Sequence, residues 1–476
     1  MSYKKLLSDT AIYGLSSIVG RALNLLLVPF YTDVLTMDDF GVMSTIFVIT
    51  AFLNEVFRYG METTYFKYAS VEDEQKVFNQ IQTSLWGSTL SLAMFCLVLV
   101  PSLSSYLGYE NRAELFYLAI GLISIDAVSA VLFGRLRHKN KAKCFSVVKL
   151  VSIFLNIGLN ILFLVVMKNH PLVEGIDKLV FVFVSYLIAN GIGLLLLLPQ
   201  LSGYRVEFSL GKFKEMLRYA FPLLIAGLFY IANEMIDRIM LNKLLPDGFY
   251  KGLNTDEAIG VYSACYKLTV FLTLGSQAFR YAAEPLFFKK SEDKDGKEFY
   301  ATSLRFVTLA GSIVVVLISF FRNEIGGIII RNINMLVGLD IVPVLLLANL
   351  FLLMYSTQSI WYKLDKSRTH FGLIISGIGI SITLAVNYFL IPYWGYMASA
   401  WATLACYGSM SVISYFLGQQ HYPVPYERIK ILLYLLATTI LVFLEKSFSF
   451  NYFVKIILLV SFLFMIFIVE KKSIQK

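Results

Sequence analysis

The sequence predicts an all-α polytopic membrane protein with about fourteen transmembrane helices, built as two six-helix lobes in parallel repeats plus two C-terminal helices. Three observations indicate this fold class. Of the 476 residues, 57% are hydrophobic and only 15% are charged, and the mean hydropathy is +0.69, more than a soluble protein needs. Apolar segments long enough to cross a bilayer recur along the whole chain, and one charged motif occurs twice.

Short polar connectors separate the apolar segments, so each segment is predicted to be one membrane span. No connector is long enough for an extramembrane catalytic domain, and we expect no enzyme activity. The expected spans cover residues 11–34, 41–66, 81–101, 113–134, 145–167, 179–201, 217–243, 259–288, 300–321, 341–362, 370–391, 396–417, 429–444 and 451–470.

Lysine and arginine are unevenly distributed between alternate connectors. About 25 lie on the side that holds both termini, and about 8 lie on the other side. Basic loops stay cytoplasmic, so both termini are predicted to be cytoplasmic. This bias also explains the formal charge of +9, since basic loops meet anionic lipid headgroups, and no nucleic-acid partner is expected.

A charged motif recurs after roughly 220 residues. The segment Phe57–Lys67 resembles Phe279–Lys289, with Phe, Arg, Tyr, Glu, Phe and Lys in register, and Gly41–Ser44 resembles Gly260–Ser263. A unit of six helices gives both copies the same orientation, which predicts parallel repeats about an axis along the membrane normal. The predicted parts are an N-lobe of residues 1–210, a C-lobe of residues 211–420 and two C-terminal helices over residues 421–476. Two similar bundles facing a polar cavity are typical of a transporter.

Charged residues at membrane depth are few, and most lie in spans 1, 2, 7 and 8, which are equivalent pairs in the two lobes. Arg21 lies near the middle of its span, with Asn24 one turn later and no acidic neighbour in its own helix, so we expect it to face an anionic ligand. The other charged residues at membrane depth in these spans are Glu55, Arg58, Glu62, Glu234, Asp237, Arg238, Lys267, Arg280 and Glu284.

Two interpretations of these charges stay open. The pairs Arg58–Glu62 and Arg280–Glu284 are four residues apart, on one helix face, and they either line a cavity or neutralise each other near the cytoplasmic boundary. The pair Asp237–Arg238 is either structural or part of a gate.

Two further charged residues lie in spans 4 and 5. Asp126 is expected to be a hydrogen-bonded core carboxylate, and Lys149 is expected to extend toward the interface. Neither residue is assigned to the substrate.

Nothing in the sequence predicts a cofactor. The four cysteines and four histidines are scattered without metal-ligand spacing, and no Gly-rich loop ending in Lys-Ser or Lys-Thr is present. We therefore expect neither a metal nor a nucleotide.

Five short stretches occur in a fixed order along the chain: Leu35–Gly41, Tyr219–Leu223, Asp237–Leu241, Ile259–Leu268 and Ile391–Thr403. In this order, on a chain of this length, they resemble the polysaccharide-biosynthesis flippases. This family comprises the Wzx-like O-antigen or capsule repeat-unit translocases of the multidrug/oligosaccharidyl-lipid/polysaccharide exporter superfamily. The fold of this family has fourteen helices in two lobes around a central cavity.

The resemblance implies a flippase that translocates undecaprenyl-diphosphate-linked oligosaccharide repeat units across the bacterial inner membrane by alternating access, for O-antigen, capsule or exopolysaccharide. Its implied partners are the lipid-linked oligosaccharide and membrane lipids, with a polysaccharide polymerase and glycosyltransferases as further candidates. The residues implied at the substrate are Arg21, Arg58, Lys267, Arg280, Asn24 and Asn233, and those implied in ion coupling or charge pairing are Glu62, Glu234, Asp237, Arg238 and Glu284.

Three alternatives remain. A drug/cation antiporter of the same superfamily would favour a cavity rich in acids and aromatics over one with several arginines. A peptidoglycan-precursor flippase fits a cationic cavity nearly as well. A membrane-embedded polymerase or glycosyltransferase would need large polar loops, whereas these connectors are short.

Overall fold

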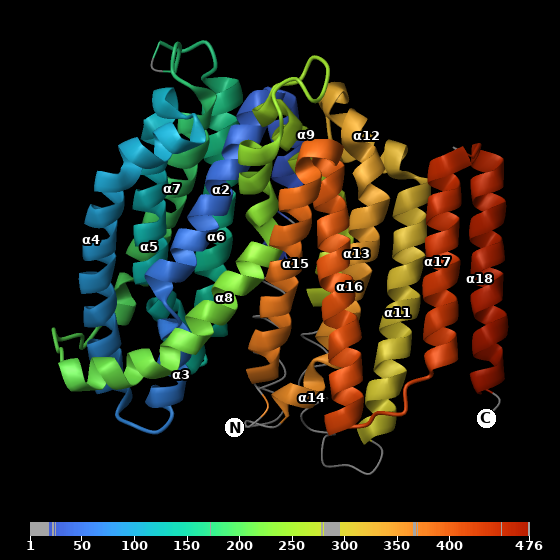
Figure 1. The fold of residues 1–476 in the computed structure, drawn as a ribbon. Coiled ribbons are helices and arrows are strands. Elements are labelled where there is room, and N and C mark those ends of the chain that lie inside the picture. The colour runs from blue at the N-terminus through green and yellow to red at the C-terminus, as the bar shows by residue number, and fades with distance from the viewer. Residues whose placement is uncertain are drawn as a thin grey trace. The chain divides into compact units, whose positions relative to one another are not determined.

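The computed structural model describes residues 19, 20, 23, 25–171, 173–277, 279, 296–364, 368, 370–448 and 450–474. All regular elements among these residues are helical, which confirms the predicted fold class (Figure 1). Thirteen helices in this part of the chain are long and apolar enough to cross a membrane, and each overlaps one predicted span. The first predicted span is described only in part, as the apolar helix Leu25–Val34. The chain is a multi-pass membrane protein.

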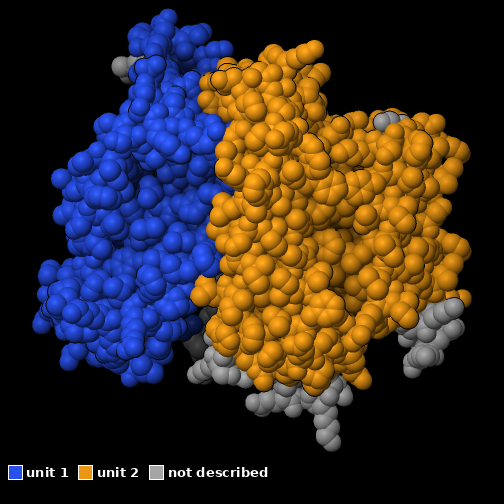
Figure 2. All heavy atoms as spheres, viewed as in Figure 1, with its two compact units in different colours: residues 1–27, 42–243 blue, residues 28–41, 244–476 orange. Residues whose placement is uncertain are grey.

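The chain forms two compact units (Figure 2). Unit 1 comprises residues 1–27 and 42–243, and unit 2 comprises residues 28–41 and 244–476. These boundaries differ from those of the predicted lobes, since residues 211–243 belong to unit 1. The lobes were derived from repeats in the sequence rather than from compactness, and they stay a prediction.

Unit 1 is a bundle in which α5 packs against α4 and α7, and α6 packs against α7. Its core contains Tyr65, Phe78, Leu85 and Leu132, whose side chains are almost fully buried. The elements are α2 (Met37–Arg58, whose first five residues belong to unit 2), α3 (Met61–Ala69), α4 (Glu74–Leu107), η1 (Glu110–Arg112), α5 (Ala113–His138), α6 (Ala142–Ile161), η2 (Leu162–Val166), α7 (Lys178–Leu197), η3 (Leu198–Leu201) and α8 (Leu210–Leu244).

Unit 2 is arranged around α13, which packs against α11 and α16, while α15 packs against α16 and α17 against α11. Trp361, Ile375 and Tyr407 belong to its core. The elements are α9 (Thr255–Tyr266), η4 (Lys267–Thr269), α11 (Gly296–Phe320), α12 (Arg322–Ile329), η5 (Ile333–Ile341), α13 (Val342–Gln358), α14 (Ile360–Lys363), α15 (His370–Trp394), α16 (Tyr396–His421), α17 (Arg428–Phe448) and α18 (Tyr452–Ile474).

Two helix starts cross closely within unit 2. A Cβ atom on Gly41 would overlap the carbonyl oxygen of Asp256, and a Cβ atom on Gly260 would overlap the carbonyl oxygen of Met37. Each carbonyl belongs to the residue four positions before the facing glycine, so the contact is symmetric. Only glycine permits such a close backbone approach. The two glycines begin matching segments of the predicted repeat, so the structure brings equivalent positions of the two copies together.

Candidate functional site

The helical span that carries Arg58 is broken immediately after this residue. Arg58 ends α2, Tyr59 and Gly60 have φ values of 31° and 73°, and α3 begins at Met61. The prediction that Arg58 and Glu62 share one face of a continuous helix is therefore wrong. A positive φ favours glycine, and a Cβ atom at Gly60 would lie 2.9 Å from the carbonyl oxygen of Ala220 in α8.

Glu62 pairs with an arginine from another helix. Its carboxylate accepts a hydrogen bond from Nη2 of Arg137, near the end of α5. The Arg137 guanidinium also lies over the Phe66 ring, 4.9 Å from its centre. Glu62 therefore neutralises Arg137. An intrahelical pair would instead have neutralised Arg58.

The break leaves Arg58 at the C-terminal end of α2, where the helix dipole favours a cation. Its side chain is half-buried, and its Nε atom is buried without a hydrogen-bond partner in the part of the chain that the structure describes. Among the described residues it forms no ion pair within 4.0 Å. Asp126 and Glu55 are acidic residues that interact with it electrostatically at longer range. A half-buried guanidinium without a direct partner is suited to binding an anion.

Glu55 lies one turn before Arg58 and packs against α8. A Cβ atom on Gly227 would overlap the Glu55 carboxylate, so the glycine makes room for this side chain. Sequence reasoning noted Glu55 as a charge at membrane depth but could not identify the glycine that accommodates it.

Asp126 lies on α5 beside Asn190 of α7. The Asn190 amide donates a hydrogen bond to Asp126 Oδ1 at 2.9 Å, and Arg58 and Lys149 are the cations that act on this carboxylate. Lys149 is exposed, and its Nζ lies 4.2 Å from the centre of the Phe133 ring. Sequence reasoning missed Asn190, because a single Asn in an apolar span gives no signal of its partner.

Arg135 is buried and holds several helices of unit 1 together. It is 2% exposed, and its guanidinium lies over the Phe78 ring and donates to Glu74 and to the carbonyl oxygen of Gln200. These contacts join α4, α5 and η3 at one end of unit 1.

The predicted residues of α8 lie together. Asp237 and Arg238 are buried and form an ion pair at 2.8 Å, and Arg238 also donates to the Glu234 carbonyl oxygen at 2.9 Å. Asn233 is buried on the same helix. The geometry fits a structural pair, and the roles assigned to these residues stay a prediction.

Of the remaining predicted residues, the structure describes only Lys267. Lys267 is exposed in the 3₁₀ turn η4 of unit 2. Arg21, Asn24, Arg280 and Glu284 lie outside the described residues, so their predicted roles are untested.

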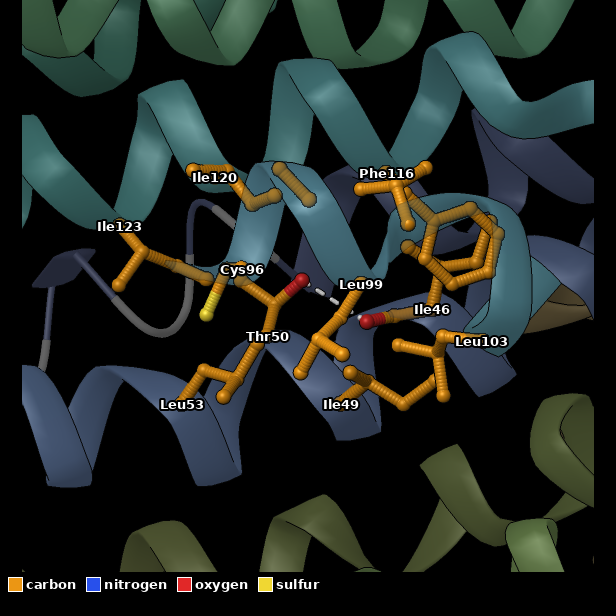
Figure 3. A pocket seen from close by; sticks show the side chains of 12 residues that line it. Ile46, Ile49, Thr50, Leu53, Cys96, Leu99, Leu103, Phe116, Ile120 and Ile123 are labelled. Atoms are coloured by element: carbon orange, nitrogen blue, oxygen red, sulfur yellow. Dashed lines mark hydrogen bonds between the residues drawn. The ribbon is translucent and has the colours of Figure 1, made fainter. Parts of the chain in front are cut away.

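A cavity of about 90 Å³ in unit 1 has a different character (Figure 3). It lies between α2, α4 and α5, and its lining is almost entirely apolar, as at Ile46, Leu99 and Phe116. The hydroxyl of Thr50 donates to the Ile46 carbonyl oxygen at 2.8 Å, so it is already satisfied. This cavity offers nothing to a charged or sugar headgroup.

Comparison with solved structures shows which known proteins share the fold. The Lipid II flippase MurJ in an inward closed conformation aligns with a TM-score of 0.76 and 16% identity, over 97% of this chain and 99% of that chain. An inward-facing multidrug resistance MATE family transporter of the MOP superfamily aligns with a TM-score of 0.65 and 13% identity, over 86% and 94%. A MOP superfamily transporter from Pyrococcus furiosus aligns with a TM-score of 0.62 and 14% identity, over 87% and 95%. The fold is that of these polytopic membrane transporters.

The sequence itself identifies a family. Residues 6–291, more than half of the chain, match the family described as polysaccharide biosynthesis protein. Comparison with curated proteins gives no significant match. The protein belongs to this polysaccharide biosynthesis family, as the resemblance predicted.

Proposed function

We propose that the protein is a flippase that moves undecaprenyl-diphosphate-linked oligosaccharide repeat units across the bacterial inner membrane. The observation that carries the proposal is Arg58, a cation at membrane depth that has no ion pair among the described residues. Membership of a polysaccharide biosynthesis family supports a sugar-bearing substrate, and the fold supports translocation.

The chemistry of such a substrate requires a protein path. Sugar hydroxyls and a diphosphate cannot cross hydrocarbon unaided, since each unsatisfied polar group costs several kcal/mol there. In the proposed mechanism, Arg58 binds the diphosphate together with Arg21, Lys267 and Arg280, while the prenyl tail remains among the lipids. Guanidinium groups suit this task because they bind phosphate oxygens in a bidentate manner.

The other polar residues have secondary roles in this proposal. Asn24 and Asn233 contact the sugar through neutral hydrogen bonds. Glu62 holds Arg137 rather than Arg58, so its proposed role is charge pairing. The proposal includes both termini in the cytoplasm and alternating access between the predicted lobes. It also includes a polysaccharide polymerase and glycosyltransferases as partners in O-antigen, capsule or exopolysaccharide synthesis.

A peptidoglycan-precursor flippase is the second candidate, because the Lipid II flippase MurJ shares the fold over nearly the whole chain. Both candidate substrates carry an anionic headgroup, so the presence of Arg58 does not distinguish between the two candidates. A drug/cation antiporter is less favoured, since Arg58, which forms no ion pair with any described residue, would repel a cationic drug.

Removal of the gene tests the proposal and separates the two candidates. We expect lipid-linked repeat units to accumulate on the cytoplasmic face, with loss of surface polysaccharide and continued growth. Accumulation of the peptidoglycan precursor would favour the second candidate. Normal surface polysaccharide without accumulation of either lipid would contradict both.

Complementation with single variants tests the proposed binding residues. Arg21→Gln, Arg58→Gln and Arg280→Gln should abolish export while the protein remains in the membrane, and the corresponding Arg→Lys variants should retain part of it. Arg205→Gln, at an exposed arginine of the connector before α8, is the matched control.

A further inference from the structure

A polar cavity of about 210 Å³ lies in unit 2, where α12 meets the turn between α17 and α18. Figure 1 shows α12 and this turn at the same end of the helices of unit 2. Spans α11 and α17 end here and α18 begins here, so the cavity lies where apolar helices give way to lipid headgroups. We call it the α12–α18 pocket, and the lining residues used below are Arg322, Glu324, Glu445, Tyr452 and Lys455.

Two buried cations share one buried carboxylate in this pocket. Glu445 is 2% exposed, accepts a hydrogen bond from Nη1 of Arg322, and lies 3.1 Å from Nζ of Lys455. Arg322 and Lys455 are each 7% exposed, and Nζ also donates to the Phe320 carbonyl oxygen at 2.6 Å. Asp340 lies 3.6 Å from Arg322 but is mostly exposed. The buried groups therefore carry a surplus of positive charge.

Glu324 provides a negative charge in the same pocket. One of its oxygens accepts a hydrogen bond from the Tyr452 hydroxyl, while Oε2 is buried and has no hydrogen-bond partner in the described part of the chain. Desolvation raises the pKa of Glu324, but the Tyr452 hydrogen bond, a hydrogen bond from the backbone N–H of Glu324 itself and the charges of Lys455 and Arg322 outweigh it, so the pKa is lowered. Glu324 is thus ionised, and its Oε2 forms no hydrogen bond of normal geometry with the described part of the chain.

We propose that the α12–α18 pocket binds the headgroup of a zwitterionic phospholipid that carries a primary ammonium group. The phosphate contacts Lys455 and Arg322, and the ammonium group donates to Oε2 of Glu324. In this arrangement each charge of the headgroup lies beside a side chain of opposite charge, and the unpartnered oxygen gains a donor. The acyl chains lie along the exposed apolar side chains of α17 and α18, such as Leu444 and Phe453. The site is independent of the proposed transport function.

The ammonium group gives the proposal its specificity. Phosphatidylcholine has the same charges as phosphatidylethanolamine, but its three methyl groups leave no N–H to donate to Glu324. Phosphatidylglycerol keeps the phosphate but lacks the cation. A charge-assisted hydrogen bond contributes enough to change an affinity about tenfold or more.

Competition between these lipids for the purified full-length protein, followed by native mass spectrometry, tests the proposal. We expect phosphatidylethanolamine to bind about tenfold more tightly than phosphatidylcholine or phosphatidylglycerol. Glu324→Gln should reduce the ratio of these affinities toward one, because a neutral amide attracts an ammonium group weakly. Glu174→Gln, at an exposed glutamate of a turn in unit 1, is the matched control and should keep the preference.

A thermal unfolding curve without added lipid shows whether the Glu324→Gln variant is folded, which we expect because the buried Glu445 contacts are unchanged. Equal affinity of the wild-type protein for phosphatidylethanolamine and phosphatidylcholine would overturn the proposal. A preference that survives in the folded Glu324→Gln variant, or a preference for phosphatidylglycerol, would overturn it as well.

Discussion

The arginines of unit 1 differ in what balances their charge. Arg135, Arg137 and Arg238 each have a carboxylate partner, whereas Arg58 has no ion pair among the described residues. Holding a charge in an apolar bundle is costly without a partner, so such residues are commonly functional. At the scale of single residues, this contrast is the reason to assign Arg58 to a ligand and the other three to the scaffold.

The two paired arginines of α5 provide a matched test of this contrast. Arg135 is 2% exposed, while the side chain of Arg137 is 37% exposed. We expect Arg135→Gln to lower the free energy of unfolding by roughly 3–5 kcal/mol, because it removes a buried guanidinium that pairs with Glu74 and donates to the Gln200 carbonyl oxygen. Arg137→Gln should cost only about 1 kcal/mol, since water screens its pair. Unfolding curves in detergent measure both, and equal losses would contradict the structural role of Arg135.

At the scale of elements, the break between α2 and α3 determines where the charges lie. A continuous helix would have placed Glu62 beside Arg58, but the positive φ values at Tyr59 and Gly60 turn α3 away. Glu62 then lies in the first turn of α3, where the dipole favours an acidic residue, and pairs with Arg137.

The break predicts a cost for alanine at Gly60. A non-glycine residue at a φ of 73° costs about 1–2 kcal/mol, and the new Cβ atom would also press on the Ala220 carbonyl oxygen. Gly87→Ala is the control, because Gly87 lies in α4 with nothing within 4 Å of a Cβ atom. The midpoint of thermal unfolding should fall for Gly60→Ala and should hold or rise for Gly87→Ala. Equal midpoints would show that the break is not required.

The crossing of α2 and α9 predicts a second effect of alanine. Gly260→Ala should destabilise unit 2, because its Cβ atom would overlap the backbone of Met37 and cannot be relieved by rotating a side chain. Gly408→Ala in α16, where a Cβ atom meets nothing within 4 Å, should be tolerated. Protein level in the membrane and thermal stability distinguish the two, and a stable Gly260→Ala variant would mean that the helices are not held this closely.

At the scale of the whole molecule, the spans were predictable because length and hydropathy are local properties of the chain. The site was predictable only in part. The partner of Glu62 is Arg137, 75 residues away, and Gly227 accommodates Glu55 from a distant helix. Such contacts depend on tertiary packing, which a single sequence does not encode in any simple pattern. The helix break was missed because one glycine in an apolar span is ordinary.

The orientation in the membrane is also a prediction about the whole molecule. Single cysteines in a background without the native ones should react differently with an impermeant reagent added outside. Lys139→Cys, in a basic connector, should be protected. Glu174→Cys, in an exposed turn of the next connector and so on the opposite side of the membrane, should react. Reaction at residue 139 but not at 174 would reverse the topology.

The most direct test is translocation by the purified protein in proteoliposomes, with a fluorescent undecaprenyl-diphosphate oligosaccharide as substrate. We predict that the wild-type protein and the control Arg205→Gln move it between leaflets, and that Arg58→Gln slows it at least about tenfold, because charge-assisted bonds to the diphosphate are lost. Arg58→Lys should be intermediate, since lysine keeps the charge but not the bidentate geometry. Wild-type rates for a folded Arg58→Gln variant would contradict the assignment of Arg58 to the substrate.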